Sequence, residues 1–249
     1  MNATLTADRP ALRPAWIPWA MLPSRLALFT AFQALFALGY FLAGSARAWD
    51  ASAAWWPFTV SFSNLVCVGL LITLFRSEGK SYWAIFRISR ENVKKDLLTL
   101  VWLLVITVPV AMLPNFLLAS WLFGDSTSAM SLFIRHLPMW AAVVGFLFFP
   151  ITQGLAELAT YFLYVEPRLE EQLKSRWVAV GLSALALGLQ HVSVPLVFNP
   201  RYLAWRGAMF IPFAILLGIV LRWRPRLLPY LAIIHILMDM GTAAMLFTA

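Results

Sequence analysis

The sequence is poor in charge, in cysteine and in the motifs of soluble enzymes. Only 12% of its 249 residues are charged and 61% are apolar, a balance that excludes a water-soluble globule of ordinary composition. Cys67 is the single cysteine, which excludes an intrachain disulfide and argues against redox chemistry. No internal repeat, Gly-rich phosphate loop, His-Glu-x-x-His motif or Gly-x-Ser-x-Gly elbow occurs. The composition therefore indicates a polytopic membrane protein.

Long apolar runs predict an all-α bundle of about seven transmembrane helices, with six to eight compatible with the pattern. A helix needs about 20 apolar residues to cross the hydrocarbon of a bilayer. The expected spans are 26–44, 55–75, 97–123, 138–165, 177–197, 207–221 and 227–248. The sixth run is short and Pro109 and Pro114 interrupt the third, so the count can shift by one in either direction.

Basic residues are distributed unevenly over the loops between these spans. Fifteen of the 19 Lys and Arg residues, Arg25 among them, fall on the side of the N-terminus, whereas Arg47, Arg135, Arg201 and Arg206 fall on the other. Short loops rich in Lys and Arg stay in the cytoplasm, so we expect a cytoplasmic N-terminus and an integral, multi-pass protein of a bacterial cell membrane. The net charge of +8 is then a topology signal, and we expect membrane lipid rather than nucleic acid as a partner.

The chain divides into a tail and one transmembrane domain. Residues 1–24, which contain four prolines, predict a tail that touches the membrane interface without forming a helix, and residues 25–249 predict the domain. Ala46-Arg47-Ala48 resembles a signal-peptidase site, but the preceding apolar run is longer than the 7–15 residues of a signal peptide, which favours an uncleaved first span. Residues 166–176 predict a solvated helix or turn, and 76–96 a short interfacial helix.

Four ionisable residues lie inside apolar runs, and they are the candidate site. They are Glu157, His191, His235 and Asp239. A charged group at mid-bilayer costs roughly 2.5–3.5 kcal/mol, so such residues mark function or mutual pairing. His235 and Asp239 are four residues apart and share a helix face. His136, beside Arg135 in an expected outer loop, is excluded from the site.

The set offers the donors of a hydrolytic centre. Glu157, His191 and His235 come from three expected spans, so they could hold a divalent metal such as zinc or activate a water molecule directly. The expected depths of Glu157, His235 and Asp239 agree, at about 12–18 Å from the cytoplasmic ends of their spans. His191 comes out about 21 Å deep, which makes it the member that this geometry supports least.

These residues resemble the motifs of the CPBP (Abi, or CAAX prenyl protease type 2) intramembrane proteases. The first motif, Glu-Glu-x-x-x-Arg, commonly followed by Gly-Tyr-x-x-Pro-Arg-Leu, is similar to the stretch from Glu157 to Leu169, which contains Tyr164 and Pro167-Arg168-Leu169. The second resembles Leu187 to His191, and the third, His-x-x-x-Asn or Asp, resembles His235 to Asp239. The resemblance covers about 150–240, within an expected catalytic core of 138–248.

Two departures from the family pattern occur together. Leu158 stands at the position of the family's second Glu and Phe162 at that of its Arg. These positions are i and i+4 on a helix, where a Glu and an Arg can form an ion pair, so replacing both leaves no orphan charge. The exchange is compatible with a retained catalytic Glu157 and also with a family member that has lost activity.

The resemblance implies hydrolysis of peptide bonds in membrane-associated substrates, with or without a lipid modification, with Glu157 as the general base. In a metal-dependent version His191 and His235, with or without Glu157, hold the ion and Asp239 orients a ligand. In a metal-free version Glu157 and His191 hold the water, while His235 and the third-motif residue bind the oxyanion. Asp239 favours the metal, since an ionised carboxylate cannot donate a hydrogen bond.

Functions outside catalysis remain open at this stage. A non-catalytic family member could act as an immunity or partner-binding protein. His191 and His235 could bind haem, and Glu157 and Asp239 could serve proton-coupled transport. The absence of internal symmetry argues against a transporter.

Overall fold

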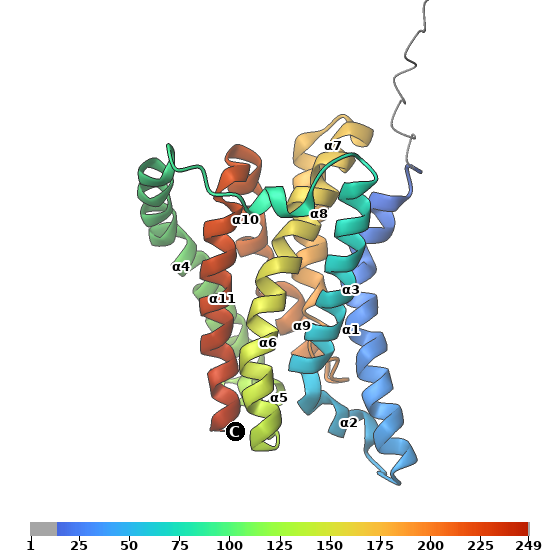
Figure 1. Cartoon of the computed structure of the whole chain (residues 1–249). Coiled ribbons are helices and arrows are strands. Elements are labelled where there is room, and N and C mark those ends of the chain that lie inside the picture. The colour runs from blue at the N-terminus through green and yellow to red at the C-terminus, as the bar shows by residue number, and fades with distance from the viewer. Residues whose placement is uncertain (1–13, 249) are drawn as a thin grey trace, which may run out of the picture.

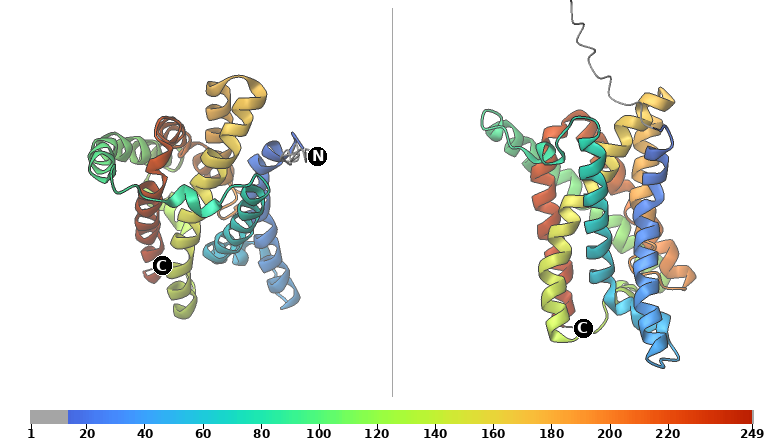
Figure 2. Two further views of the ribbon diagram at one scale, coloured as in Figure 1. Left: turned by 45° about the horizontal axis from the view of Figure 1, so that its top comes forward. Right: turned by 45° about the vertical axis from the view of Figure 1, so that its right-hand side comes forward.

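The computed structural model describes residues 14–248, and helices account for nearly all of this range. Six helical segments are long and apolar enough to cross a membrane, and α8 (Arg176–Gln190) is a shorter apolar helix. The first and last described residues lie at opposite ends of the bundle (Figures 1 and 2). The prediction of an all-α, multi-pass membrane protein is therefore confirmed.

The elements follow one another with short connections. In chain order, the transmembrane helices and the segments continuous with them are α1 (Ile17–Leu42), α2 (Ala48–Ser52), η1 (Ala53–Trp55), α3 (Trp56–Arg76), α4 (Val93–Phe123), α6 (Met139–Leu158), η3 (Ala159–Val165), α7 (Glu166–Leu173), α8, α9 (Pro200–Ala208), α10 (Ile211–Trp223), η4 (Pro225–Leu227), α11 (Leu228–Ala244) and η5 (Met245–Phe247). The short η2 (Tyr82–Phe86) and α5 (Ser126–Phe133) lie between spans at opposite ends of the bundle. α6 stands near the middle, packed against α3 on one side and α11 on the other.

The first helix begins earlier than the sequence predicts. α1 starts at Ile17, so the expected non-helical tail of 1–24 is wrong for its last eight residues, while its first thirteen lie outside the described residues. Pro18 occupies the first turn of α1, where a missing N–H is not needed. The consequence is that Arg25 belongs to the helix rather than to a loop, and its side chain is fully buried.

The fifth and sixth predicted spans differ from the structure at the boundary between them. α8 ends at Gln190 instead of continuing to 197, because Pro195 cannot donate a helical hydrogen bond and disfavours helical geometry in the residue before it. The next span begins early, at Pro200, where the Asn199 side chain caps α9 by accepting hydrogen bonds from two backbone N–H groups. Arg206, predicted in an outer loop, lies instead in α9 and is buried.

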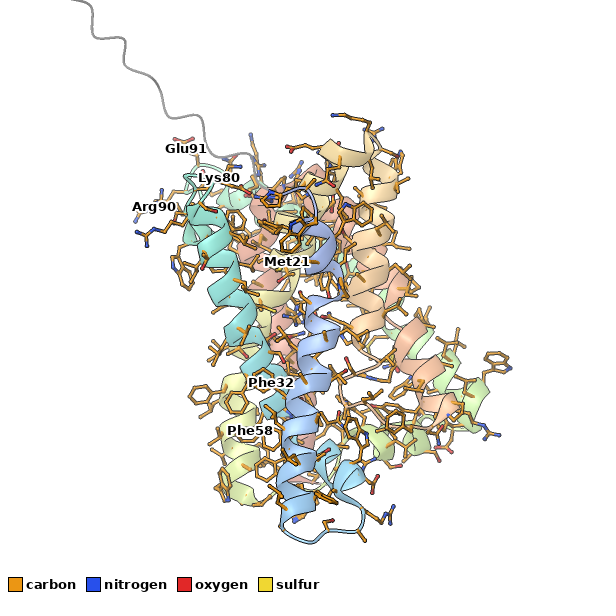
Figure 3. The ribbon with its side chains drawn as sticks, turned by 90° about the vertical axis from the view of Figure 1, so that its right-hand side faces the viewer. Met21, Phe32, Phe58, Lys80, Arg90 and Glu91 are labelled. Atoms are coloured by element: carbon orange, nitrogen blue, oxygen red, sulfur yellow. The ribbon has the colours of Figure 1, made fainter. Side chains whose placement is uncertain are left out.

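The end of the bundle that carries the N-terminus is rich in charged residues. Lys80, Arg90 and Glu91 lie there, whereas Phe32 and Phe58 lie along the apolar length of the bundle (Figure 3). The predicted interfacial helix in 76–96 is only the short η2, and its Tyr82 is anchored in the bundle by a hydrogen bond to the Leu155 carbonyl at 2.7 Å.

An ion pair fastens the loop after α3 to α7. Glu78 accepts hydrogen bonds from both Nε and Nη2 of Arg168. Burial by itself would raise the pKa of Glu78, but the hydrogen bonds and charge of Arg168, together with Lys80, outweigh it and hold the pKa below its ordinary value. The segment 166–173 is helical, as predicted, and is continuous with α6 through η3.

Candidate functional site

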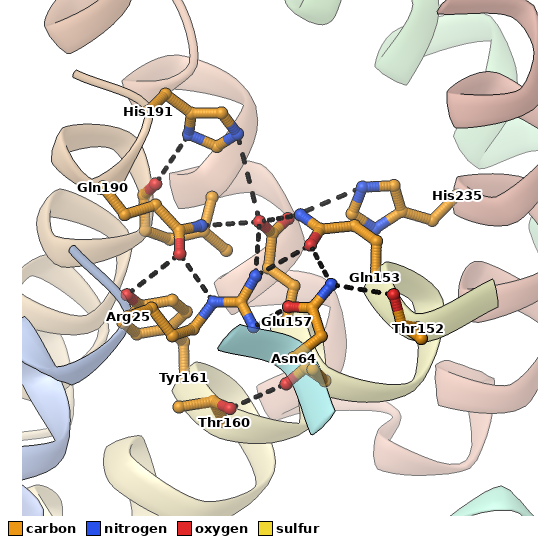
Figure 4. Close-up of polar contacts among 12 residues, drawn as sticks. Arg25, Asn64, Thr152, Gln153, Glu157, Thr160, Tyr161, Gln190, His191 and His235 are labelled. Atoms are coloured by element: carbon orange, nitrogen blue, oxygen red, sulfur yellow. Dashed lines mark hydrogen bonds and ion pairs between the residues drawn. The ribbon is translucent and has the colours of Figure 1, made fainter. Parts of the chain in front are cut away.

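Glu157 lies one residue before the end of α6, at the point where the helix changes its winding. The seven residues that follow α6 form the π-helical segment η3. This geometry is uncommon in proteins overall, but where it occurs it is frequently at a functional site. The Glu157 side chain is only 4% exposed and points to the centre of a polar cluster inside the bundle (Figure 4). A carboxylate in this position needs hydrogen-bond donors and a countercharge.

His235 and Asp239 reach this carboxylate from α11. His235 Nε2 lies 3.6 Å from Glu157 Oε1 and 3.4 Å from Asp239 Oδ2. The close approach of α11 to α6 depends on Gly154, where an added Cβ would meet Ile236 at 2.5 Å and the Ala232 carbonyl oxygen at 3.0 Å. The absence of a side chain at Gly154 therefore brings the third predicted motif against the first.

His191 reaches Glu157 from the other side. It follows the last residue of α8, and its Nδ1 lies 2.9 Å from the Leu187 carbonyl oxygen. Since a carbonyl can only accept, Nδ1 carries the hydrogen in the neutral ring and Nε2 keeps a lone pair. That Nε2 lies 3.9 Å from Glu157 Oε2. The structure thus brings together all four predicted residues, including His191, which the depth argument supported least.

Arg206 holds the segment that carries His191. The guanidinium is buried and donates hydrogen bonds to the carbonyl oxygens of His191 at 3.2 Å and Val194 at 2.8 Å. It also stacks 4.4 Å above the Phe133 ring. These contacts fix the non-helical turn after α8 from the side of α9.

A buried arginine and three carboxamides complete the site, and the sequence analysis missed them. Arg25 donates to Gln190 Oε1 at 2.6 Å, Asn64 Oδ1 at 2.7 Å and Gln153 Oε1 at 2.8 Å. The amide nitrogens of Gln153 and Gln190 then donate to Glu157 Oε2 at 2.6 and 2.5 Å. Arg25 Nη2 itself lies 3.7 Å from that oxygen.

This network gives the two carboxylate oxygens different surroundings. Oε2 accepts both carboxamide hydrogen bonds, and the Arg25 guanidinium behind the amides stabilises the negative charge. Oε1 faces His235. Because Arg25 donates to the side-chain oxygens of Gln153 and Gln190, the amide nitrogens of both residues face Glu157, and a flip of either side chain would break these hydrogen bonds.

The missed residues carried a recognisable signal. Gln153 and Gln190 are polar residues in apolar runs, one of them four residues before Glu157 and the other directly before His191. The count of basic residues places Arg25 at a cytoplasmic flank, whereas the apolar residues on both sides of it indicate a position inside a span. A search for uncharged polar residues next to the ionisable ones would have found both glutamines.

The two departures from the protease motif are filled by apolar packing. Leu158 and Phe162 are buried in one hydrophobic cluster with residues of α8, α10 and α11. The Phe162 ring lies where a Cβ on Gly218 would meet it at 2.8 Å. Neither position therefore carries an unpaired buried charge.

The donor arrangement does not fit a bound metal ion. Oε2 of Glu157 is already engaged by two carboxamides, and within residues 14–248 no group of three or more His, Cys, Asp or Glu side chains is disposed to hold an ion. The side chains hydrogen-bonded to the Glu157 carboxylate are instead the donors Gln153 and Gln190.

A narrow apolar cleft of about 30 Å³ lies beside the site, and His235 and Thr107 are on its wall. It separates α11 from α4, which is joined to the rest of the bundle near its ends. Asp96 accepts from Arg226 at 2.8 Å, and Asn115 Oδ1 accepts from Trp205 at 2.9 Å.

The remaining residues singled out by the sequence stay outside the site. His136 is exposed between α5 and α6, and Cys67 is buried in α3. Comparisons with family models, with curated proteins and with solved structures find no match for this chain.

Proposed function

We propose that this protein is an intramembrane endopeptidase that hydrolyses peptide bonds of membrane-associated substrates through a water activated by Glu157. The observation that supports this most strongly is the position of one buried carboxylate between two imidazoles, at 3.6 and 3.9 Å. A scaffold has no need of three ionisable groups at one buried point, because each is costly to bury. We place the protein in the membrane of a bacterial cell.

The activating pair is Glu157 with His191. Both the carboxylate and His191 Nε2 present lone pairs, so a water beside them donates one hydrogen to each and turns its own lone pair outward. Attack on the scissile carbonyl carbon forms the C–O bond while Glu157 takes a proton from the water. Glu157 then returns this proton to the amine nitrogen as the C–N bond breaks, leaving a carboxylic acid and an amine.

His235 supplies the hydrogen bond to the oxyanion. Its Nε2 faces acceptor oxygens of Asp239 and Glu157, an environment that favours a hydrogen on this nitrogen. An N–H fixed in this position is available to the carbonyl oxygen as negative charge develops. Asp239 Oδ2 lies 3.4 Å from the same nitrogen, one helical turn away. This metal-free route replaces the preference for a metal that the sequence analysis drew from Asp239.

The resemblance to the CPBP proteases supports the same proposal, since its three motifs correspond to the segments that carry Glu157, His191 and His235. The loss of the second Glu and of the Arg of the first motif concerns Leu158 and Phe162, which pack away from the carboxylate in the apolar cluster. Arg25 provides a positive charge near Glu157 from a different helix. The base retains an electrostatic partner in this way.

The other functions considered have less support. A porphyrin between His191 and His235 would need the space that Glu157 fills, since the carboxylate lies within 4 Å of both imidazoles. A non-catalytic partner-binding protein would have no use for the two carboxamides aligned on Glu157 Oε2. No feature of the described structure specifically supports either alternative.

Cleavage of single-span peptides in proteoliposomes tests the proposal. Mass spectrometry of a peptide library incubated with the wild type should show new termini, and Glu157→Gln should reduce their formation by at least about 10²-fold, because a carboxamide cannot accept the proton. The exposed Glu91→Gln is the matched control and should cleave normally. A metal chelator should leave the rate unchanged. Undiminished cleavage by a folded Glu157→Gln protein would refute the proposal.

A further inference from the structure

A second pocket is lined by residues of α7, the start of α8 and the end of α10, and these segments lie at the end of the bundle where α7 is labelled in Figure 1. Its volume is about 910 Å³. None of the four residues of the Glu157 site lines it. What this pocket binds is therefore a question separate from the proposed hydrolysis.

Glu166 forms part of the wall of this pocket. The residue is 1% exposed, and its Oε2 atom is buried without a hydrogen-bond partner among the described residues. A buried carboxylate oxygen that lacks a donor is costly, and such atoms in a folded protein call for an explanation. A ligand that brings several N–H donors into the pocket would satisfy it.

The charges around the pocket are of both signs and equal in number. Glu166, Glu170 and Glu171 line it from α7, and Lys174, Arg176 and Arg222 line it from the following turn, α8 and α10. Glu170 and Arg222 pair with each other at 2.8 Å. The acidic side disfavours a purely anionic ligand and the basic side disfavours a polybasic peptide. A zwitterion matches both sides.

The apolar part of the pocket indicates a lipid-like environment. Phe162, Leu163 and Leu221 contribute to the lining, and Trp177 at its margin is 61% exposed. Exposed tryptophan beside basic residues is typical of the level of lipid headgroups. The ligand is thus expected to carry its charges next to an apolar body.

We propose that this pocket binds a phosphoethanolamine group, a primary ammonium joined to a phosphodiester, as in the headgroup of phosphatidylethanolamine. The ammonium, with three N–H donors, lies toward Glu166 and Glu170. The phosphodiester lies toward Lys174 and Arg176. The acyl glycerol part follows Phe162, Leu163 and Leu221 out to the lipid.

Native mass spectrometry of the purified full-length protein in mixed micelles tests this assignment. The wild type should retain phosphatidylethanolamine in preference to phosphatidylcholine, whose ammonium has no N–H, and to phosphatidylglycerol, which has no ammonium. Glu166→Gln should weaken phosphatidylethanolamine binding on the order of tenfold, as expected for one charge-assisted hydrogen bond. Lys174→Gln, a second variant at an exposed position, should weaken all three phospholipids, and Glu91→Gln should change none of them.

A soluble competitor distinguishes the two sources of the ligand. Glycerophosphoethanolamine should displace the lipid at comparable concentrations if the natural ligand is soluble. It should fail to displace the lipid if the acyl body contributes to binding, and phosphatidylethanolamine is then the ligand. Equal retention of the three phospholipids by the wild type would overturn the proposal. An undiminished phosphatidylethanolamine preference in Glu166→Gln, together with undiminished binding of all three phospholipids by Lys174→Gln, would overturn it as well.

Discussion

Individual residues at the Glu157 site depend on one another through charge. Arg25 has no exposed surface, and its nearest acidic oxygen is Glu157 Oε2 at 3.7 Å. Gln153 and Gln190 bridge the pair, each accepting from Arg25 and donating to Glu157. Removing one charge leaves the other buried without compensation, which is far more costly than the net gain from forming the pair.

Replacement of Arg25 measures this dependence. Arg25→Met should lower the free energy of unfolding by about 3–5 kcal/mol, the usual cost of breaking a buried ion pair. Adding Glu157→Gln should restore part of that loss, because the remaining charge disappears. Denaturation of the detergent-solubilised wild type, the two single variants and the double variant completes a double-mutant cycle. The exposed Arg90→Met is the control. Equal stability of Arg25→Met and Arg90→Met would show that the buried pair is not a stabilising feature.

At the scale of elements, the site is assembled by close contact between α6 and α11. The motif His235-x-x-x-Asp239 predicted a shared helix face, and both side chains do lie on the same side of α11. The sequence could not show that η3 is π-helical or that Arg206 holds the turn after α8, because these features depend on packing, whereas Pro195 was a readable signal that α8 ends before residue 197. The winding of η3 and the contacts of Arg206 were therefore the least predictable parts.

A glycine substitution tests the contact between these two helices. Gly154→Ala puts a Cβ 2.5 Å from the Ile236 side chain and 3.0 Å from the Ala232 carbonyl oxygen, so the Ile236 side chain must shift and α11 is pushed away from α6. We expect a loss of about 1–3 kcal/mol in stability from overpacking, and a large fall in turnover because His235 moves with α11. Gly181→Ala in α8, with no atom within 4 Å of the added Cβ, is the control and should be neutral or stabilising. Normal turnover in Gly154→Ala would show that the close spacing of α6 and α11 is not required for activity.

Across the whole molecule, apolar runs predicted the class of fold because the length and hydropathy of a span are fixed by the bilayer. Four ionisable residues inside apolar runs predicted the centre of the site for a similar reason, since the cost of a charge in such a run makes them conspicuous. The supporting carboxamides escaped notice because Gln and Asn carry no charge. The pocket around Glu166 could not be predicted, since it arises where three separate segments meet.

The direction of the chain in the membrane is also testable. The distribution of basic residues predicts a cytoplasmic N-terminus, and the two ends of the described chain lie at opposite ends of the bundle. In a Cys67→Ser background, a membrane-impermeant thiol reagent applied to intact cells should label Ala46→Cys and spare Ser81→Cys. The opposite labelling pattern would show that the N-terminus lies on the outer side of the membrane.

Isotope labelling of the product tests the central claim most directly, that Glu157 activates water for attack on a peptide bond inside the membrane. Proteoliposomes in H₂¹⁸O should yield a product whose new carboxyl terminus contains one ¹⁸O per cleavage, and Glu157→Gln should yield essentially none of that product. Formation of the ¹⁸O-labelled product by the folded Glu157→Gln protein at the wild-type rate would contradict the account.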